Sequence, residues 1–149
     1  MFDLESKNQD EIVINTKKTS ITVNIANFEI DANLEVGKIV GPGEFEIGDA
    51  SIRGIAVKDG RTIYDVEVGG VHIGIVGGIE DGLDDLGVSD ILCTSSVRTI
   101  REIEPKLVIA MGNLDGMVSE LKLTARVEKK LKIKNLESLP STLEVVALN

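Results

Sequence analysis

The chain has 149 residues, a length that predicts a single domain spanning residues 1–149. Hydrophobic residues make up 42% of it, enough for a packed core, but aromatic residues make up only 3% and tryptophan is absent. The formal net charge is −9 at pH 7, and an acidic protein repels a phosphate backbone. The composition therefore argues against a nucleic-acid partner. It leaves valine, isoleucine and leucine to fill the core, which favours sheets.

The single cysteine and the N-terminal residues restrict the class of protein further. Cys93 has no partner, which excludes an intramolecular disulfide and a multi-cysteine zinc site. Met1–Glu5 contains no basic region followed by an apolar stretch, so we expect no signal peptide. No apolar run approaches the ~20 residues that span a bilayer. These features predict a cytoplasmic protein without a membrane partner.

The first half of the sequence predicts strands joined by tight turns. Each predicted strand is a short run of β-branched and aliphatic residues, and polar turns or glycines separate the runs. Within residues 61–76, the pair Gly69-Gly70 separates two such runs, and this pair is typical of a two-residue β-hairpin turn. We expect strands, alone or in hairpins, within residues 12–14, 21–23, 34–40, 45–47, 51–57 and 61–76.

The middle of the sequence predicts a strand–helix–strand unit over Asp90–Met111. Residues 77–90 form a loop rich in glycine and acidic residues before it. Ser95 or Ser96 is expected to cap a short helix that ends near Ile103, and a second buried strand follows. Such a unit crosses over right-handed and places its two strands parallel.

The C-terminal part predicts one short helix and two more strands. The apolar positions between Met117 and Leu121 suit a turn of amphipathic helix, and strands are expected around Leu131–Ile133 and at Leu143–Leu148. A strand-rich first half followed by strand–helix–strand predicts an α/β fold of layered sheets and helices, on the border with α+β.

Several motifs in this order resemble the metallo-β-lactamase-fold hydrolases, specifically the small branch similar to ascorbate-6-phosphate lactonases. The resemblance extends over roughly residues 12–148 and implies a shortened layered domain of that fold, with a strand-rich first half. The segments that carry it are Gly41–Ile47, Ile52–Ile55, Thr62–Tyr64, Gly70–Ile73, Ile103–Ile109, Leu139–Pro140 and Leu143–Leu148.

The same resemblance implies a metal site whose ligands this sequence lacks. The family holds one or two metal ions with an H-x-H-x-D-H block after its second or third strand, yet residues 25–40 contain no histidine. A metal-bridging aspartate normally stands where this chain has Gly77 and Gly78. A strand-ending histidine normally stands where this chain has Gly112, followed by Asn113. The resemblance therefore implies a degenerate domain without the metal ligands.

Ligand chemistry leads to the same expectation without the family. A catalytic zinc needs about three imidazole or carboxylate ligands and an open position. His72 is the only histidine, and it alternates with Val71 and Ile73 in mid-strand. We interpret it as a plain strand residue. The sequence predicts no catalytic residue, no metal and no cofactor, and leans toward a protein that is not an enzyme.

The leading functional hypothesis is a non-catalytic protein that acts through binding or self-association. A shortened sheet is expected to leave an apolar face or a strand edge open, which predicts a homo-oligomer or a protein partner. One alternative is a hydrolase that uses carboxylates with Mg²⁺ or Mn²⁺, and another is a small-molecule binder that uses the vacated pocket. The candidate positions are Glu44, Glu80 and Asp81 for the first, and Gly77, Gly78, Gly112 and Asn113 for the second.

Three other features are interpreted as structural. The acid cluster in residues 80–90 lacks the D-x-[DN]-x-[DN]-G spacing, so we expect a solvated loop, with a weak cation or a basic partner as the alternative. Cys93 lacks the G-x-S-x-G elbow and is expected to complete a buried strand. The basic residues from Arg126 to Lys134 have no interleaved aromatics, which predicts a solvated face rather than a single-strand binder.

Overall fold

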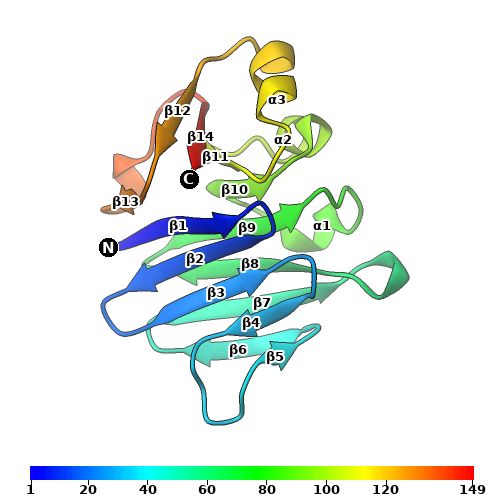
Figure 1. Ribbon diagram of the computed structural model, residues 1–149, viewed down its shortest axis with the longest axis vertical. Coiled ribbons are helices and arrows are strands. Elements are labelled where there is room, and N and C mark those ends of the chain that lie inside the picture. Colours follow the sequence, from blue (N-terminus) through cyan, green and yellow to red (C-terminus); the bar gives the residue numbers. More distant parts are fainter.

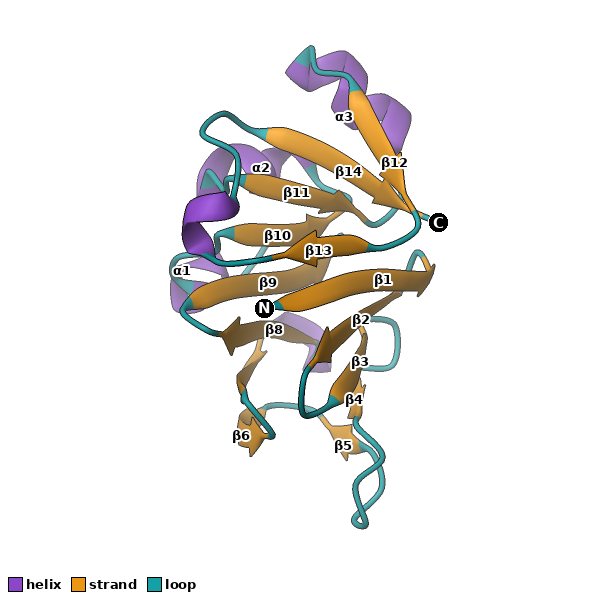
Figure 2. Ribbon diagram, turned by 90° about the vertical axis from the view of Figure 1, so that its left-hand side faces the viewer, coloured by secondary structure: helices purple, strands orange, loops and turns teal.

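The computed structural model describes residues 1–149, and most of its regular structure is strand. Two sheets pack face to face, and the helices lie on the outer face of only one of them (Figures 1 and 2). Sheet A has six strands in the order β13-β1-β2-β3-β4-β5, and sheet B has eight in the order β12-β14-β11-β10-β9-β8-β7-β6. The expected layered fold of sheets and helices is confirmed, with an α+β character.

Sheet A is antiparallel throughout. Its centre is the predicted hairpin, confirmed by the cross-strand pair of Ile14 and Ile21. β13 joins from the far end of the sequence, because Leu131 pairs with Leu4 of β1. The strands of sheet A are β1 (Phe2–Asn8), β2 (Glu11–Thr16), β3 (Ser20–Asn24), β4 (Glu29–Asp31), β5 (Ile39–Val40) and β13 (Leu131–Ile133).

Sheet B is antiparallel in one half and parallel in the other. The change occurs at β9, which pairs antiparallel with β8 across the predicted Gly69-Gly70 turn and parallel with β10. The strands are β6 (Gly43–Ile47), β7 (Ala50–Ala56), β8 (Thr62–Val68), β9 (Val71–Gly77), β10 (Ile91–Thr94), β11 (Leu107–Ala110), β12 (Ala125–Glu128) and β14 (Glu144–Leu148). Short 3₁₀ turns occupy Lys58–Gly60 and Leu136–Ser138.

The predicted strand–helix–strand unit is present. Helix α2 (Val97–Ile103) connects β10 to β11, and the two strands are parallel as expected. Of the two candidate caps Ser96 is the N-cap, because its hydroxyl accepts the Thr99 N–H at 3.1 Å. The remaining helices are α1 (Leu83–Leu86) and α3 (Leu114–Leu121). No helix is long and apolar enough to span a bilayer.

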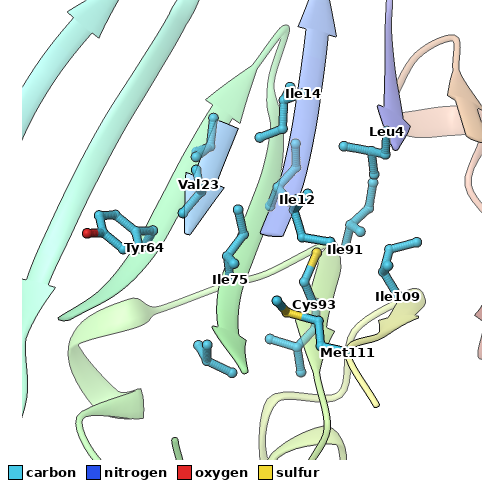
Figure 3. Packing of buried hydrophobic residues seen from close by; sticks show 14 of the residues in the cluster. Leu4, Ile12, Ile14, Val23, Tyr64, Ile75, Ile91, Cys93, Ile109 and Met111 are labelled. Carbon is cyan, nitrogen blue, oxygen red and sulfur yellow. The ribbon is translucent and has the colours of Figure 1, made fainter. Parts of the chain in front are cut away.

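The core lies between the two sheets and beneath the helices. Figure 3 shows Ile12 and Ile14 of sheet A pointing toward Ile75, Cys93 and Ile109 of sheet B. These five side chains belong to one cluster of 37 buried hydrophobic residues. Each aliphatic side chain buried there contributes ~1.5–3 kcal/mol. The β-branched residues that dominate the sequence therefore hold the two sheets together, as the composition predicted.

One predicted strand, residues 34–40, is wrong except for its last two residues, which form β5. Residues 34–38 form a loop between β4 and β5, and Val36 is 83% exposed. Two residues around this loop, Asn33 at φ 54° and Gly37 at φ 83°, have left-handed backbone that an extended strand cannot contain. The alternation of Leu34 and Val36 with polar residues therefore does not indicate a strand here.

The expected apolar face is also wrong. No helix covers the outer face of sheet A (Figure 2), and Val13 is the one hydrophobic residue among those that line the depressions on that face. Glu5, Lys7, Asn15, Thr22 and Asp31 are among those that line two shallow depressions on it. Polar groups on a sheet face remain hydrated without a covering layer. The open face of sheet A thus gives no reason for another chain to cover it.

Candidate functional site

A cleft of about 410 Å³ opens at the carboxyl ends of the parallel strands of sheet B. Gly77 ends β9 and Gly78 follows it into this cleft, Ser95 follows β10, and Gly112 and Asn113 follow β11. Loops of sheet A complete the lining, which includes Gln9, Asp10, Ile25 and Phe28. The ends of parallel strands are the usual place for ligand sites in such sheets.

Glycine is required at two of these positions. Gly77 has φ 56° and Gly112 has φ 90°, and both values disfavour residues with a side chain. A Cβ on Gly77 would lie 3.1 Å from the Ile25 side chain, and one on Gly112 would lie 3.2 Å from the Gln9 side-chain oxygen. Ile25 and Gln9 therefore occupy the space into which longer side chains at these two positions would extend.

Asn113 ties two of the loops together. Its side-chain amide donates to the Ser95 carbonyl at 2.9 Å, across the loops that follow β10 and β11. Asn113 has φ 57°, a left-handed conformation that asparagine tolerates better than most residues. Its side chain does not cap α3, although it precedes the first residue of that helix. Asn113 thus fixes the shape of the cleft and keeps one amide hydrogen for other partners.

The cationic group at the cleft is Arg61. Its Nη2 donates to Asp81 Oδ1 at 2.8 Å, and its Nε donates to the Lys58 carbonyl at 3.0 Å. Desolvation alone would raise the pKa of Asp81, but the Lys58 N–H at 3.1 Å and Arg61 hold that pKa below its ordinary value. Both side chains of the pair are about one-third exposed, so it adds little stability. It does hold the guanidinium in place beside the cleft.

The predicted carboxylates do not gather at the cleft. Glu80 lies in a shallow depression beside it and accepts a hydrogen bond from the Ser96 hydroxyl. Asp81 is bound to Arg61 as described, and Glu44 lies on β6, three strands away from β9 in sheet B. The cleft itself is lined by the four other predicted positions, Gly77, Gly78, Gly112 and Asn113.

The donor set of the cleft does not fit a hydrolytic zinc centre. Asp10 is its one carboxylate, and its lining contains no imidazole and no thiol. Nowhere in the chain do three histidine, cysteine, aspartate or glutamate side chains converge in a way that could hold a metal ion. A pair of catalytic metal ions needs several such ligands, including bridging ones. The residues present therefore do not form the site that the resemblance implies.

The histidine belongs to a different polar group, which we call the Asp65 cluster: Asp65, Arg53 and His72. It lies on the face of sheet B that α1 covers, opposite the core between the sheets. His72 Nδ1 is 3.2 Å from Asp65 Oδ1, and Arg53 Nη2 is 3.3 Å from Asp65 Oδ2. Arg53 Nη2 also donates to the Leu86 carbonyl of α1 at 3.0 Å. His72 is therefore more than the plain strand residue that we expected.

Sequence patterns contained a signal for this cluster but not for most of the cleft. The Gly69-Gly70 turn sets the hairpin register that pairs Glu67 with His72 and Asp65 with Gly74. This register places Asp65 diagonally across from His72 on one sheet face. Residues such as Gln9 and Arg61 reach the cleft from distant loops, and no local pattern announces them.

The fold matches that of a known protein. No protein-family model matches the sequence, and neither does any curated protein. A crystal structure from Thermotoga maritima, whose name describes a candidate Zn-dependent hydrolase of the metallo-β-lactamase superfamily, matches over 99% of both chains with a TM-score of 0.72. The sequence identity is 12%, so the likeness shows the fold alone. The expected metallo-β-lactamase-like fold is confirmed.

Proposed function

We propose that this chain is a non-catalytic protein with a metallo-β-lactamase-like fold that binds a small polar molecule in its cleft. The observation that supports this is a contrast within one site. The cleft at the ends of β9, β10 and β11 is open and about 410 Å³ in volume, yet Asp10 is its one metal-ligating side chain. The space for a ligand is kept, and the groups that would hold catalytic metal ions are not there.

The chemistry of the lining suggests the class of ligand. Hydrogen-bond donors come from Arg61, the Ser95 hydroxyl and the Gln9 amide, and Asp10 can accept. Ile25 and Phe28 add apolar wall on the side of sheet A. One cation, one carboxylate and several neutral polar groups suit a small molecule that carries both hydroxyl and carboxylate groups.

The rival is a hydrolase that uses Mg²⁺ or Mn²⁺ held by Glu44, Glu80 and Asp81. These three side chains would have to converge on one ion. Glu80 is bound to Ser96 and Asp81 to Arg61, while Glu44 lies on an edge strand. No contact favours this rival over binding. The closer likeness to ascorbate-6-phosphate lactonases stays a prediction, and the activity in the name of the T. maritima protein belongs to that protein.

The proposal can be tested by NMR titration of ¹⁵N-labelled protein with gluconate, citrate and glucose. We expect gluconate or citrate to shift the amide signals of Gly78, Ser95, Gly112 and Asn113, because the ligand carboxylate pairs with Arg61. The variant Ser95→Phe places a large ring in the cleft and should abolish these shifts.

The matched control is Ser141→Phe, which makes the same change at an exposed position in the loop before β14. It should bind the probes as the unmodified protein does. The proposal fails if none of the three probes shifts the cleft amides at millimolar concentration. It also fails if Ser95→Phe leaves the shifts unchanged.

A further inference from the structure

The free edge of sheet B is formed by β12, a four-residue strand whose sequence is Ala125-Arg126-Val127-Glu128. β12 pairs on one side with β14 in parallel and is the terminal strand of the sheet (Figure 2). The Val127 side chain is 58% exposed, and it is one of five large hydrophobic side chains in the chain that are exposed. An open edge carries backbone donors and acceptors that another strand can use.

The ladder determines which residues of β12 offer those groups. In a parallel pair, alternate residues direct both N–H and C=O toward the partner strand. The Glu128 carbonyl accepts the Asn149 N–H at 3.1 Å, so Glu128 bonds toward β14 and Arg126, two residues earlier, does the same. Ala125 and Val127 therefore direct their N–H and C=O toward the open side.

We propose that two copies of this chain pair through β12 in an antiparallel two-fold arrangement centred on Val127. Both groups that Val127 offers then bond to the Val127 of the second copy. In this register Ala125 lies opposite Lys129 of the other copy, the residue that follows β12. The result is one continuous sheet across the dimer, formed by the same patch on both subunits.

The charges of β12 are complementary in this register. Pairing about Val127 places Arg126 of each copy opposite Glu128 of the other, twice per dimer. The two side chains already lie on one face, since Arg126 is 3.8 Å from Glu128 and 3.4 Å from Glu144 within the subunit. Opposite charges directly across an antiparallel pair are favourable, and like charges are unfavourable. The strand thus has a self-complementary sequence.

The other open edges lack this property. Self-pairing of β6 would bring Glu44 and Glu46 against the same acids of the second copy. Self-pairing of β13 would bring together Lys132 and the lysines that flank it, Lys130 and Lys134. β5 has only two residues. Like charges on an edge are a common protection against pairing, so β12 is the edge at which a second copy fits.

The area of such a contact is small, because four residues a side bury much less than a standard interface. We therefore expect a weak dimer that forms with rising concentration. Light scattering and sedimentation velocity on the full chain should show a mass that rises toward twice the 16.0 kDa of one chain at hundreds of micromolar protein.

Charge reversal tests the register. Arg126→Glu and Glu128→Arg each place like charges across the pair, and each should weaken dimerisation about tenfold. The double variant with both changes restores opposite charges in a homodimer and should restore its dissociation constant. Circular dichroism of all three variants checks that the monomer is folded.

A second pair of variants tests the backbone contact. Val127→Pro removes an N–H that points away from β14 and should abolish the dimer, whereas Val127→Ala keeps that N–H and should retain most of it. A chain that stays at 16.0 kDa at hundreds of micromolar overturns the proposal. The proposal is also overturned if a dimer forms and neither single charge reversal changes its dissociation constant. Ligand binding in the cleft is measured separately, so either proposal can fail alone.

Discussion

Two polar regions of sheet B can be compared, the cleft at the ends of its parallel strands and the Asp65 cluster on its helix-covered face. In the cluster, Asp65 is 3% exposed and both of its oxygens have partners from other strands. In the cleft, polar residues such as Arg61, Ser95 and Gln9 line an open space. The two regions differ in burial, and burial determines how much of their bonding capacity the protein itself must satisfy.

This difference shows why residue type alone is a poor guide to a site. A histidine beside an aspartate is a common catalytic arrangement, yet here the pair connects β8 and β9, and Arg53 extends it to α1. The cleft, which occupies the usual functional position of the sheet, contains glycine and amide side chains instead. We interpret the Asp65 cluster as a structural contact and the cleft as the place of binding.

Removing the centre of the Asp65 cluster should have the largest effect. Asp65→Ala leaves Arg53 and His72 without their shared carboxylate, and a hydrogen bond to a charged group contributes about 1.5–3 kcal/mol. Arg53 and His72 are each 41% exposed and can be rehydrated, so we expect a loss of about 2–3 kcal/mol in urea denaturation. Gluconate or citrate binding in the cleft should be unchanged.

The matched control is Asp65→Asn, which keeps the shape and one acceptor and should cost less than Asp65→Ala. A loss of under about 0.5 kcal/mol for Asp65→Ala would show that the cluster is not structural. If a folded Asp65→Asn protein lost ligand binding, the cleft would depend on the Asp65 cluster, and our separation of the two regions would be wrong.

Tyr64, next to Asp65 on β8, is a second buried polar side chain, but unlike Asp65 it has no hydrogen-bond partner. Its side chain is fully buried on the core side, and its hydroxyl has no hydrogen-bond partner. Desolvation, with a smaller contribution from the charge of Glu29, raises the pKa of Tyr64 to about 12. Because the folded state holds the phenol proton more tightly than the unfolded state does, this difference favours folding at pH values below the ordinary pKa of 10.0. The contribution is lost as the pH rises toward 12.

Tyr64→Phe should therefore be neutral or stabilising by about 1 kcal/mol at pH 7, because it removes a buried hydroxyl without a partner. Between pH 10 and 12 the unmodified protein should lose about 2 kcal/mol relative to this variant. Denaturant midpoints of both proteins across this pH range measure the difference. Parallel pH profiles for the two proteins would contradict the burial of the phenol.

The glycines of the cleft should show a graded effect. Gly77→Ala forces a side chain onto left-handed backbone and against Ile25 at 3.1 Å, so we expect a loss of about 1.5 kcal/mol. Gly78→Ala has no left-handed φ and meets only the Ser95 hydroxyl at 3.2 Å, so its cost should stay below about 0.5 kcal/mol. Thermal denaturation compares them, and equal losses would contradict the backbone argument.

The ion pair at the cleft should have the smallest effect on stability. The pKa of Asp81 is lowered, so its contribution is present above its ordinary value of 3.8 and is lost as pH falls through the folded value. Asp81→Asn should change the acid unfolding profile only slightly, because the carboxylate is hydrated. It should alter probe binding more, since it frees Arg61. A large stability loss at pH 7 would contradict the exposed character of this pair.

Local patterns in the sequence predicted much of sheet B and little of the cleft. Alternation and the Gly69-Gly70 turn gave β8 and β9, and the buried runs gave β10 and β11 with their parallel pairing. β12 was interpreted only as a basic surface, because Arg126 and its neighbours are polar while the backbone forms the strand. β1 was missed for a related reason: Asp3 and Glu5 interrupt the buried Phe2 and Leu4.

Only the part of the cleft formed by the ends of predicted strands could be predicted from the sequence. Gly77, Gly78, Gly112 and Asn113 follow predicted strands, so their meeting at one sheet edge could be expected. Gln9, Asp10 and Arg61 come from loops whose positions depend on how sheet A packs on sheet B. Such positions are set by the tertiary structure, and a single sequence contains no periodic signal for them.

The central claim, that this cleft has no hydrolytic metal centre, is tested most directly by calorimetric titration of Zn²⁺ into protein freed of metal by a chelator. We expect no tight, stoichiometric binding, because Asp10 alone cannot form a zinc site with the neutral groups around it. One or two equivalents of Zn²⁺ bound with a submicromolar dissociation constant, together with chelator-sensitive hydrolysis, would contradict the account.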